Sequence, residues 1–200
     1  MSSRIDPFSR QDPSDDARFY AVDRLVTHIE DGAIEALRTF YGGLLPVGAR
    51  VLDLMSSWRS HLPHDGGFAE VVGLGMNAAE MTANPQLDSF VVHDLNATPV
   101  LPFDDSSFDA AVCTVSVQYL TSPLDVFADL RRVLRDGAPF AVAFSNRCFP
   151  TKAVAVWLYG SDAEHLDLVR AYFASSGFTG VEHQRLTSPD DPVFVVTGSA

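Results

Sequence analysis

The sequence has few cysteines and no long apolar run. Its two cysteines, Cys113 and Cys148, are too few for a disulfide framework and do not have Cys-x-x-Cys spacing. This usage is typical of a reducing compartment, so we expect a cytoplasmic protein. No stretch approaches the ~20 apolar residues of a membrane span, and the N-terminus has no apolar signal-peptide core. We therefore expect neither export nor membrane insertion.

Basic residues are also scarce. Lys and Arg number 14 against 26 Asp and Glu, which gives a formal net charge of −12 at pH 7. A surface of this sign repels phosphate backbones and anionic lipid headgroups at long range. The composition therefore predicts no nucleic-acid or membrane partner.

Two nucleotide-binding motifs and a complete set of metal ligands are missing. No Gly-x-x-x-x-Gly-Lys-Ser/Thr occurs, and no Gly-x-Gly-x-x-Gly follows the first predicted strand, which argues against nucleoside triphosphates and nicotinamide dinucleotides. His61 and His64 are three residues apart, but Pro63 lies between them and no third ligand is evident. We expect no metal site.

The 200 residues, 46% of them hydrophobic, suffice for one domain with a full core. Residues 1–16 are rich in Ser, Asp and Pro, so we expect a flexible N-terminal tail that drapes over the domain or moves freely. Residues 17–200 are predicted to form a single domain, with a helical lid over residues 17–45. Apolar spacing from Phe19 to Tyr41 predicts two short helices, broken near Asp31-Gly32, with Gly42-Gly43 ending the second.

Seven short β-rich runs follow this helical region, at residues 50–54, 70–74, 90–93, 109–115, 140–145, 181–186 and 193–197. Their alternation with helices predicts an α/β fold, a doubly wound Rossmann-like sheet that is mainly parallel with helices on both faces. Only about six residues separate the last two runs, too few for a crossover of ~10–12 residues, so these strands should be antiparallel.

Two helices between these strands have clear start signals. Ser122-Pro123 reads as an N-cap and first helical position, and the predicted buried stripe runs to Gly137 through Leu124, Phe127, Leu130, Val133 and Leu134. Ser161 and Glu164 form a capping box for a second helix that ends at Gly177.

Ligands of a doubly wound sheet bind beyond the carboxyl ends of its strands. The residues in these places after the first four strands are Asp53-Leu54-Met55-Ser56-Ser57-Trp58, Gly73-Leu74-Gly75-Met76-Asn77, Asp94-Leu95-Asn96 and Ser116-Val117-Gln118-Tyr119.

Several of these blocks carry a family resemblance. The best-matching ones are Val51-Leu52-Asp53-Leu54, Asp94-Leu95-Asn96, the Leu-Pro-Phe-x-x-x-Ser-Phe-Asp run at 101–109, and Arg132-Val133-Leu134-Arg135-Asp136-Gly137 at the end of a helix. From about residue 47 to 196 the chain resembles a class I S-adenosylmethionine-dependent methyltransferase of type 11. The stretches 52–63 and 144–152 resemble a distinct subgroup, in which the first motif reads Asp-Leu-Met-Ser-Ser-Trp.

The resemblance implies S-adenosylmethionine as cofactor and a methyl acceptor, which we expect to be a small molecule bound by a monomer or homodimer. It assigns the cofactor to a set of residues at the strand ends: Asp53, Met55, Ser56, Ser57, Trp58, Gly75, Met76, Asn77, Asp94, Leu95, Asn96 and Ser116. Asp94 is expected either to contact the adenine amino group or to cap a nearby turn.

The chain departs from the family pattern in two places. Met55, Ser57 and Arg59 occupy the glycine positions of the first motif, where Gly admits a close backbone approach. Gly75-Met76-Asn77 stands where the family has an acid that binds both ribose hydroxyls, which leaves Asn77 or Glu80 as substitutes.

The acceptor is expected between the lid and the ends of the fourth and fifth strands. Candidate substrate-binding residues there are Tyr20, Gln118, Tyr119, Asn146, Arg147 and Phe149. Tyr119 could position or deprotonate a substrate or simply pack, and Arg147 could hold a substrate anion or pair with Asp125 or Asp129. Tyr119 and Arg147 are the candidate catalytic residues, although methyl transfer often needs no protein acid or base. The alternatives to a methyltransferase are a non-catalytic or regulatory protein on this fold and a non-methylating use of the cofactor, such as a cyclase or decarboxylase.

Overall fold

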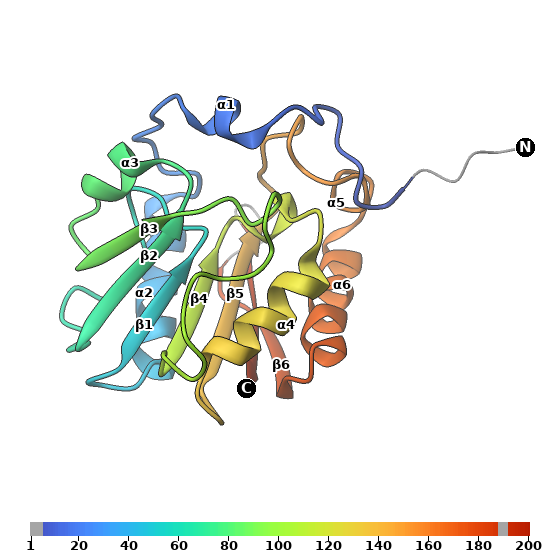
Figure 1. Cartoon of the computed structure of the whole chain (residues 1–200). Coiled ribbons are helices and arrows are strands. Elements are labelled where there is room, and N and C mark those ends of the chain that lie inside the picture. Colours follow the sequence, from blue (N-terminus) through green and yellow to red (C-terminus); the bar gives the residue numbers. More distant parts are fainter. Residues whose placement is uncertain (1–5, 188–191) are drawn as a thin grey trace, which may run out of the picture.

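A seven-stranded sheet forms the centre of the molecule, in the order β3-β2-β1-β4-β5-β7-β6 (Figure 1). The computed structural model describes residues 6–187 and 192–200. The strands are β1 (Arg50–Leu54), β2 (Glu70–Gly75), β3 (Ser89–Val92), β4 (Ala110–Thr114), β5 (Pro139–Ser145), β6 (Thr179–Arg185) and β7 (Val193–Ser199). All seven strands expected from the sequence are present, with ends shifted by two residues at most.

The pairing directions confirm the predicted architecture. β1 pairs in parallel with β2 and β4, β2 with β3, and β4 with β5. β7 lies between β5 and β6 and is antiparallel to both. The strand order reverses between β1 and β4, which places the switch point of this doubly wound sheet at their carboxyl ends.

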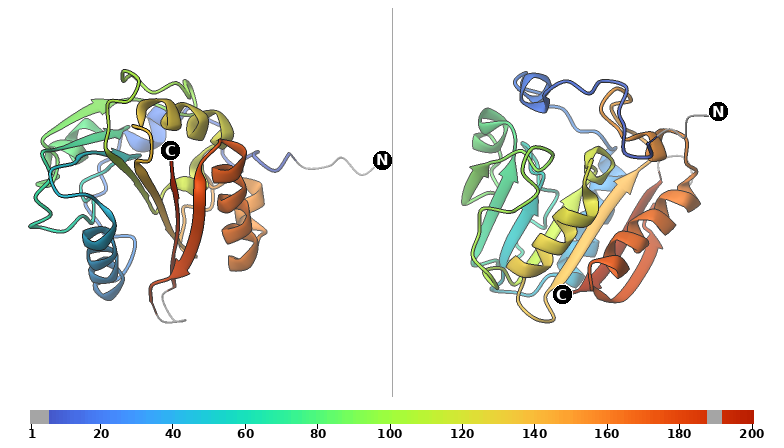
Figure 2. Two further views of the ribbon diagram at one scale, coloured as in Figure 1. Left: turned by 90° about the horizontal axis from the view of Figure 1, so that it is seen from below. Right: turned by 45° about the vertical axis from the view of Figure 1, so that its right-hand side comes forward.

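Helices cover both faces of the sheet, as expected (Figure 2). They are α1 (Asp16–Tyr20), α2 (Asp31–Leu44), α3 (Ala78–Thr82), α4 (Pro123–Val133), α5 (Ala155–Leu158) and α6 (Asp162–Ser175), with a 3₁₀ turn at Val117–Tyr119. α2 packs on one face, whereas α4 and α6 pack on the other. The predicted capping box of Ser161 and Glu164 is present at the start of α6.

The largest cluster of buried rings lies between the sheet and α4. The ring of Phe127 is 5.3–5.5 Å, centroid to centroid, from those of Phe140, Tyr172 and Phe173, in edge-to-face geometry. Such aromatic pairs add stabilisation beyond the area that they bury.

The predicted first helix differs from the structure. Only Asp16–Tyr20 is helical, and residues 21–30 are irregular. Val22, Leu25 and Val26, expected on a buried stripe, are 53–64% exposed. Polar groups of the segment instead form hydrogen bonds with residues around β1 and β2, a tertiary effect that overrides the helical pattern.

The ends of two other helices also differ from prediction. Gly42-Gly43 lies inside the last turn of α2, which ends at Leu44 just before Pro46. A proline disfavours helical geometry in the residue before it, and this explains the later end. α4 ends at Val133, and Leu124, expected in its buried stripe, is 47% exposed.

Residues 6–16, expected within a flexible tail, lie along the segment that follows β5. Arg10 forms an isolated antiparallel bridge with Val154, and the Asp12 amide donates to the Thr151 carbonyl at 2.8 Å. The expectation for residues 1–5 lies outside the described residues. Composition could not reveal these contacts, because their partners are some 140 residues away in the sequence.

A buried charge cluster fixes this arrangement. Lys152 is fully buried, with its Nζ 3.1 Å from both Asp12 Oδ2 and Asp16 Oδ1, and Arg10 Nη1 is 2.6 Å from Asp16 Oδ2. Removing one partner of such a buried cluster is costly, because it leaves an uncompensated charge.

We predict that Phe127→Ala destabilises the domain by about 3–5 kcal/mol, because it leaves a cavity among the rings. Leu124→Ala, on the exposed side of the same helix, should change stability by no more than about 0.5 kcal/mol. Urea unfolding followed by circular dichroism measures both free energies. Equal losses in the two variants would contradict this description of the core.

Candidate functional site

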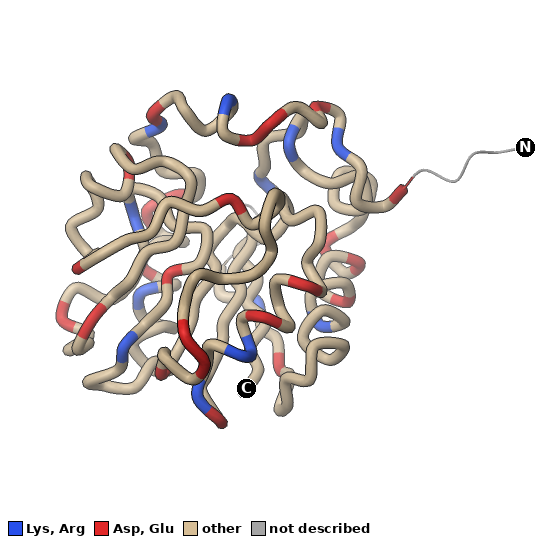
Figure 3. Tube along the Cα trace, viewed as in Figure 1, with Lys and Arg blue, Asp and Glu red and all other residues tan. Residues whose placement is uncertain are grey.

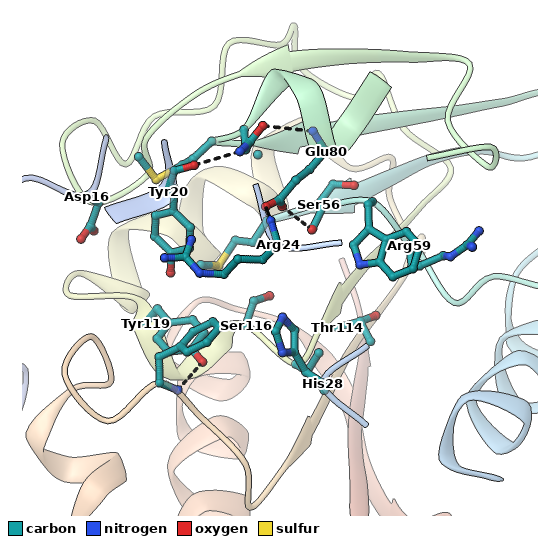
Figure 4. Close-up of a pocket in the computed structure, with 18 of the residues that line it drawn as sticks. Asp16, Tyr20, Arg24, His28, Ser56, Arg59, Glu80, Thr114, Ser116 and Tyr119 are labelled. Atoms are coloured by element: carbon teal, nitrogen blue, oxygen red, sulfur yellow. Dashed lines mark hydrogen bonds between the residues drawn. The ribbon is translucent and has the colours of Figure 1, made fainter. Parts of the chain in front are cut away.

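A cavity of about 380 Å³ opens at the carboxyl ends of the first four strands, beneath α1 and residues 21–28 (Figure 4). This volume is within the range of small-molecule sites. The N-terminal segment, residues 6–30, crosses above the carboxyl ends of the strands (Figure 1).

The turn after β1 keeps an unusual backbone conformation. Met55 has a φ of 60°, in the left-handed region that glycine adopts most easily. The Ser56 amide donates to the Leu74 carbonyl at 2.8 Å, which ties the turn to β2. The chain keeps this turn with a methionine at the position where the family pattern has its first glycine.

A glycine on the neighbouring strand makes room for this turn. A Cβ added to Gly75 would lie 2.1 Å from the Ser56 carbonyl oxygen, a separation that no side chain permits. No helix occurs in residues 55–69, which connect β1 to β2. The close backbone contact in this site is therefore between the turn and the end of β2.

Asp53 lies beneath the turn rather than on the cavity wall. Its carboxylate is buried, and it accepts a hydrogen bond from Ser56 Oγ at 2.5 Å. Burial raises the pKa of Asp53 to about 6, while hydrogen bonds from Ser56 and Ser60 oppose the shift. Asp53 thus supports the turn from below.

The end of β2 is joined to the N-terminal segment. Asn77 Oδ1 caps α3, and its Nδ2 donates to the Tyr20 carbonyl and to Asp23 Oδ1. Glu80, which is buried, accepts from Ser57 Oγ at 2.6 Å and from the Arg24 amide at 2.7 Å. Each carboxylate oxygen has a second lone pair, so Glu80 retains acceptor capacity on the cavity wall.

The loop after β3 is held by its own side chains. Asp94 Oδ1 accepts from the amides of Asn96 and Ala97, which is the turn-capping geometry. Asn96 donates to Asp16 Oδ2 and to the Tyr119 carbonyl, and it accepts from Thr121. Asn96 therefore links this loop to α1 and to the end of β4.

The end of β4 carries a second left-handed residue, Val115, with a φ of 48°. Such a conformation is unfavourable for a β-branched side chain, and strain of this kind clusters at functional sites. Thr114 Oγ1 is fixed by the buried Tyr41 hydroxyl at 2.8 Å.

Tyr119 is held as a neutral phenol. Its hydroxyl accepts the Phe149 amide at 2.9 Å, and burial raises its pKa to about 12. A phenol with this pKa is not deprotonated near neutral pH, so Tyr119 is suited to hydrogen bonding rather than to acting as a base.

Aromatic rings line the side of the cavity next to β5. The Phe149 ring lies 6.0 Å from that of Tyr119, 5.5 Å from that of Phe19 and 5.1 Å from that of His28. Partial burial lowers the pKa of His28, which favours its neutral form. Arg147 Nη2 is 2.7 Å from Glu30 Oε1, an ion pair that was not expected from the sequence.

The structure brings most of the sequence-predicted residues to this one cavity. Those on its wall are Met55, Ser56, Ser57, Trp58, Gly75, Met76, Asn77, Asp94, Leu95, Asn96, Ser116, Tyr20, Tyr119, Arg147 and Phe149. Asp53, Gln118 and Asn146 are not among the lining residues: Asp53 and Gln118 are buried elsewhere, and Asn146 is exposed.

Several residues of the N-terminal segment that line the cavity were not identified from the sequence, among them Asp16, Arg24, Thr27 and His28. Nothing in a single sequence marks them, since residues 21–30 approach the strand ends without regular structure.

Across residues 6–187 and 192–200, no three His, Cys, Asp or Glu side chains group as metal ligands. Within the same ranges, no helix has both the length and the apolarity to cross a membrane.

Comparisons with known proteins agree with this geometry. A family model described as a methyltransferase domain matches residues 57–142. No curated protein matches the sequence.

Solved structures with the same fold include two S-adenosylmethionine-dependent methyltransferases. One, from Aquifex aeolicus, has a TM-score of 0.61 at 14% identity and covers 98% of this chain and 99% of its own. Another, from Mesorhizobium loti, has a TM-score of 0.59 at 16% identity, with 82% and 98% covered. The [4+2]-cyclase SpnF has a TM-score of 0.64 at 13% identity, with 88% of each chain covered.

We predict that glycine is preferred to alanine at position 55. Met55→Gly and Met55→Ala lose the same side-chain packing, but alanine must also adopt a φ of 60°. The glycine variant should be more stable by about 1 kcal/mol. At Ala36, inside α2, the order should reverse, with Ala36→Gly losing about 0.5–1 kcal/mol. Chemical denaturation measures all of these differences; an alanine preference at position 55 would contradict the left-handed turn.

The raised pKa of Asp53 predicts a pH-dependent stability. In the unfolded chain this carboxyl has a pKa of about 3.9, so between about pH 4 and pH 6 the folded state binds the additional proton. The contribution of Asp53 to the free energy of unfolding therefore falls by about 3 kcal/mol at most as pH rises through this window. Above about pH 6 this contribution no longer changes with pH.

We expect the unfolding free energies of wild type and Asp53→Asn to diverge as pH rises from 4.5 to 7.5. Only the wild type loses stability as the Asp53 carboxyl is deprotonated. Asp104→Asn, on an exposed loop, serves as the control and should run parallel to wild type. Parallel curves for Asp53→Asn would show that the carboxyl is not shifted.

Proposed function

We propose that the chain is a class I S-adenosylmethionine-dependent methyltransferase that uses S-adenosylmethionine to methylate a small molecule. A methyltransferase family model matches residues 57–142, and solved S-adenosylmethionine-dependent methyltransferases share the fold, which supports the proposal. One observation carries the proposal: the turn at Met55 keeps a left-handed backbone and leaves a cavity of about 380 Å³ at the switch point. The missing glycines have not closed the site.

The residues on the cavity wall fit the cofactor chemically. We assign the adenine end to Asp94 and Leu95, where Asp94 Oδ2 is available as an acceptor for an amino group and Leu95 is apolar. We assign the ribose hydroxyls to Glu80, which takes the place of the acid absent from Gly75-Met76-Asn77. The turn Met55-Ser56-Ser57 and Trp58 would adjoin the amino-acid end.

The remaining wall is assigned to the acceptor. The bound cofactor supplies an electrophilic methyl group, and rate enhancement then depends on alignment and exclusion of water. In this proposal Tyr119 donates a hydrogen bond to the acceptor, Tyr20 and Phe149 enclose it, and neutral His28 accepts a proton when the nucleophile carries one. Asn96 and Ser116 hold the loops after β3 and β4 in place.

A second candidate is a non-catalytic protein on the same fold. The side chains of Asn77, Asn96 and Ser57 all form hydrogen bonds within the protein, and this observation favours it. A third use of the site, without methyl transfer, has a precedent in the fold of SpnF, described as a [4+2]-cyclase.

Calorimetric titration with S-adenosylmethionine and S-adenosylhomocysteine tests the proposal. Wild type should bind both at one site, and Asp94→Ala should weaken binding about 10-fold or more, because a charge-assisted hydrogen bond to the adenine amino group is lost. Asp104→Ala should leave the affinity unchanged.

Catalysis is tested with cofactor carrying a labelled methyl group, incubated with a small-molecule extract. Label entering the extracted compounds, dependent on Asp94, supports an enzyme that methylates. Cofactor binding without transfer favours the cyclase-like or regulatory alternatives. Absence of saturable heat at millimolar cofactor would contradict the proposal as a whole.

A further inference from the structure

Arg24 places a positive charge inside the cavity without a carboxylate partner among the described residues. Its guanidinium lies 4.2 Å from the centroid of the Phe19 ring and 5.6 Å from that of Phe149. Its Nη1 donates to the Val22 carbonyl at 3.0 Å, which leaves most of its five N–H donors uncommitted. Figure 4 shows the side chain extending across the cavity toward Tyr20.

The position of Arg24 is fixed by its own backbone. Its amide donates to Glu80 Oε1, so the residue is attached to the wall of the cavity while its guanidinium points away from that carboxylate toward the rings. The side chain is partly buried, so water screens its charge less than at the surface. A fixed, partly desolvated guanidinium is well suited to bind a planar oxyanion.

None of the ion pairs recorded among the described residues includes Arg24. Asp16 is already paired with Arg10 and Lys152, and Arg147 is paired with Glu30. Glu80 and Asp94 belong to the part of the site that the proposed function assigns to the cofactor. Residues of both charge signs occur along the segment above the sheet (Figure 3). Arg24 is not a member of any of the ion pairs just described.

The rings around this guanidinium supply flat apolar walls. Phe149 stacks on Tyr119 with an interplanar angle of 29°, and His28 and Phe19 meet its ring nearly edge-on. A flat apolar surface next to a guanidinium is complementary to an aromatic ring that bears an anionic group.

We propose that the methyl acceptor is a small aromatic carboxylate, with its carboxylate bound to the guanidinium of Arg24 and its ring packed against Phe149. The inference rests on the proposed function and names the substrate class of the same site. Arg24 is then the residue that selects an anionic acceptor in a chain whose net charge is −12.

The carboxylate is the anchor, so the methyl group goes to a second group on the ring, a hydroxyl or an amine. The lone pair of that hydroxyl or amine forms the new bond to the methyl carbon. The bond between the methyl carbon and sulfur breaks, and the electron pair of that bond stays on sulfur. The proton of the hydroxyl or amine passes to the neutral imidazole of His28.

The test uses the full chain saturated with S-adenosylhomocysteine and two probes, 4-hydroxybenzoate and its uncharged analogue 4-hydroxybenzamide, titrated by NMR. Wild type should bind the carboxylate at least about 10-fold more tightly than the amide. Arg24→Gln should abolish this preference, Arg24→Lys should keep part of it, and Arg170→Gln, at an exposed pair on α6, should keep all of it.

Equal affinity of wild type for both probes, or binding of neither, would overturn the inference, and this comparison requires no variant. A second titration tests whether Arg24 binds the carboxylate of the cofactor instead of that of the acceptor. If Arg24→Gln weakens S-adenosylhomocysteine about 10-fold but leaves 5′-methylthioadenosine unchanged, Arg24 binds the cofactor's carboxylate and the inference is wrong. Failure of wild type to bind S-adenosylhomocysteine would instead contradict the proposed function.

Discussion

The close contact between the turn after β1 and the end of β2 is the constraint on which the site depends. The Ser56 carbonyl lies where a side chain at residue 75 would have to be, so Gly75 is required, and Met55 must take a left-handed conformation to bring the turn there. Buried Asp53 holds the turn through Ser56. The turn thus forms with a methionine in a left-handed conformation, at the cost of local strain at Met55.

The N-terminal segment completes the site through polar contacts rather than through an apolar helix face. Its backbone forms hydrogen bonds with Trp58, Asn77 and Glu80 on one side of the cavity. On the other side, the Lys152 cluster holds the beginning of the segment. Asp16 belongs to both that cluster and the hydrogen bond from Asn96, so the cover is connected to the loop after β3. These contacts hold the cover on both sides of the cavity.

Most of the fold could be predicted because strands and capped helices leave local signals. The seven β-rich runs, the antiparallel end of the sheet and the capping box at Ser161 all depend on residues close in sequence. The cover of the cavity could not be predicted, since Arg24 is placed by Glu80 and Arg10 by Val154, partners that no local pattern identifies. The exposed Val22 and Leu25 show the same effect, because a helical period was overridden by tertiary hydrogen bonds.

A crystal structure of the chain with S-adenosylhomocysteine tests the central claim most directly. The account predicts the nucleoside in the cavity, with its adenine beside Leu95 and its amino group within hydrogen-bonding distance of Asp94, while Met55 keeps a positive φ. A cavity filled by the side chains of Met55 and Trp58, with the ligand absent or bound elsewhere, would contradict it.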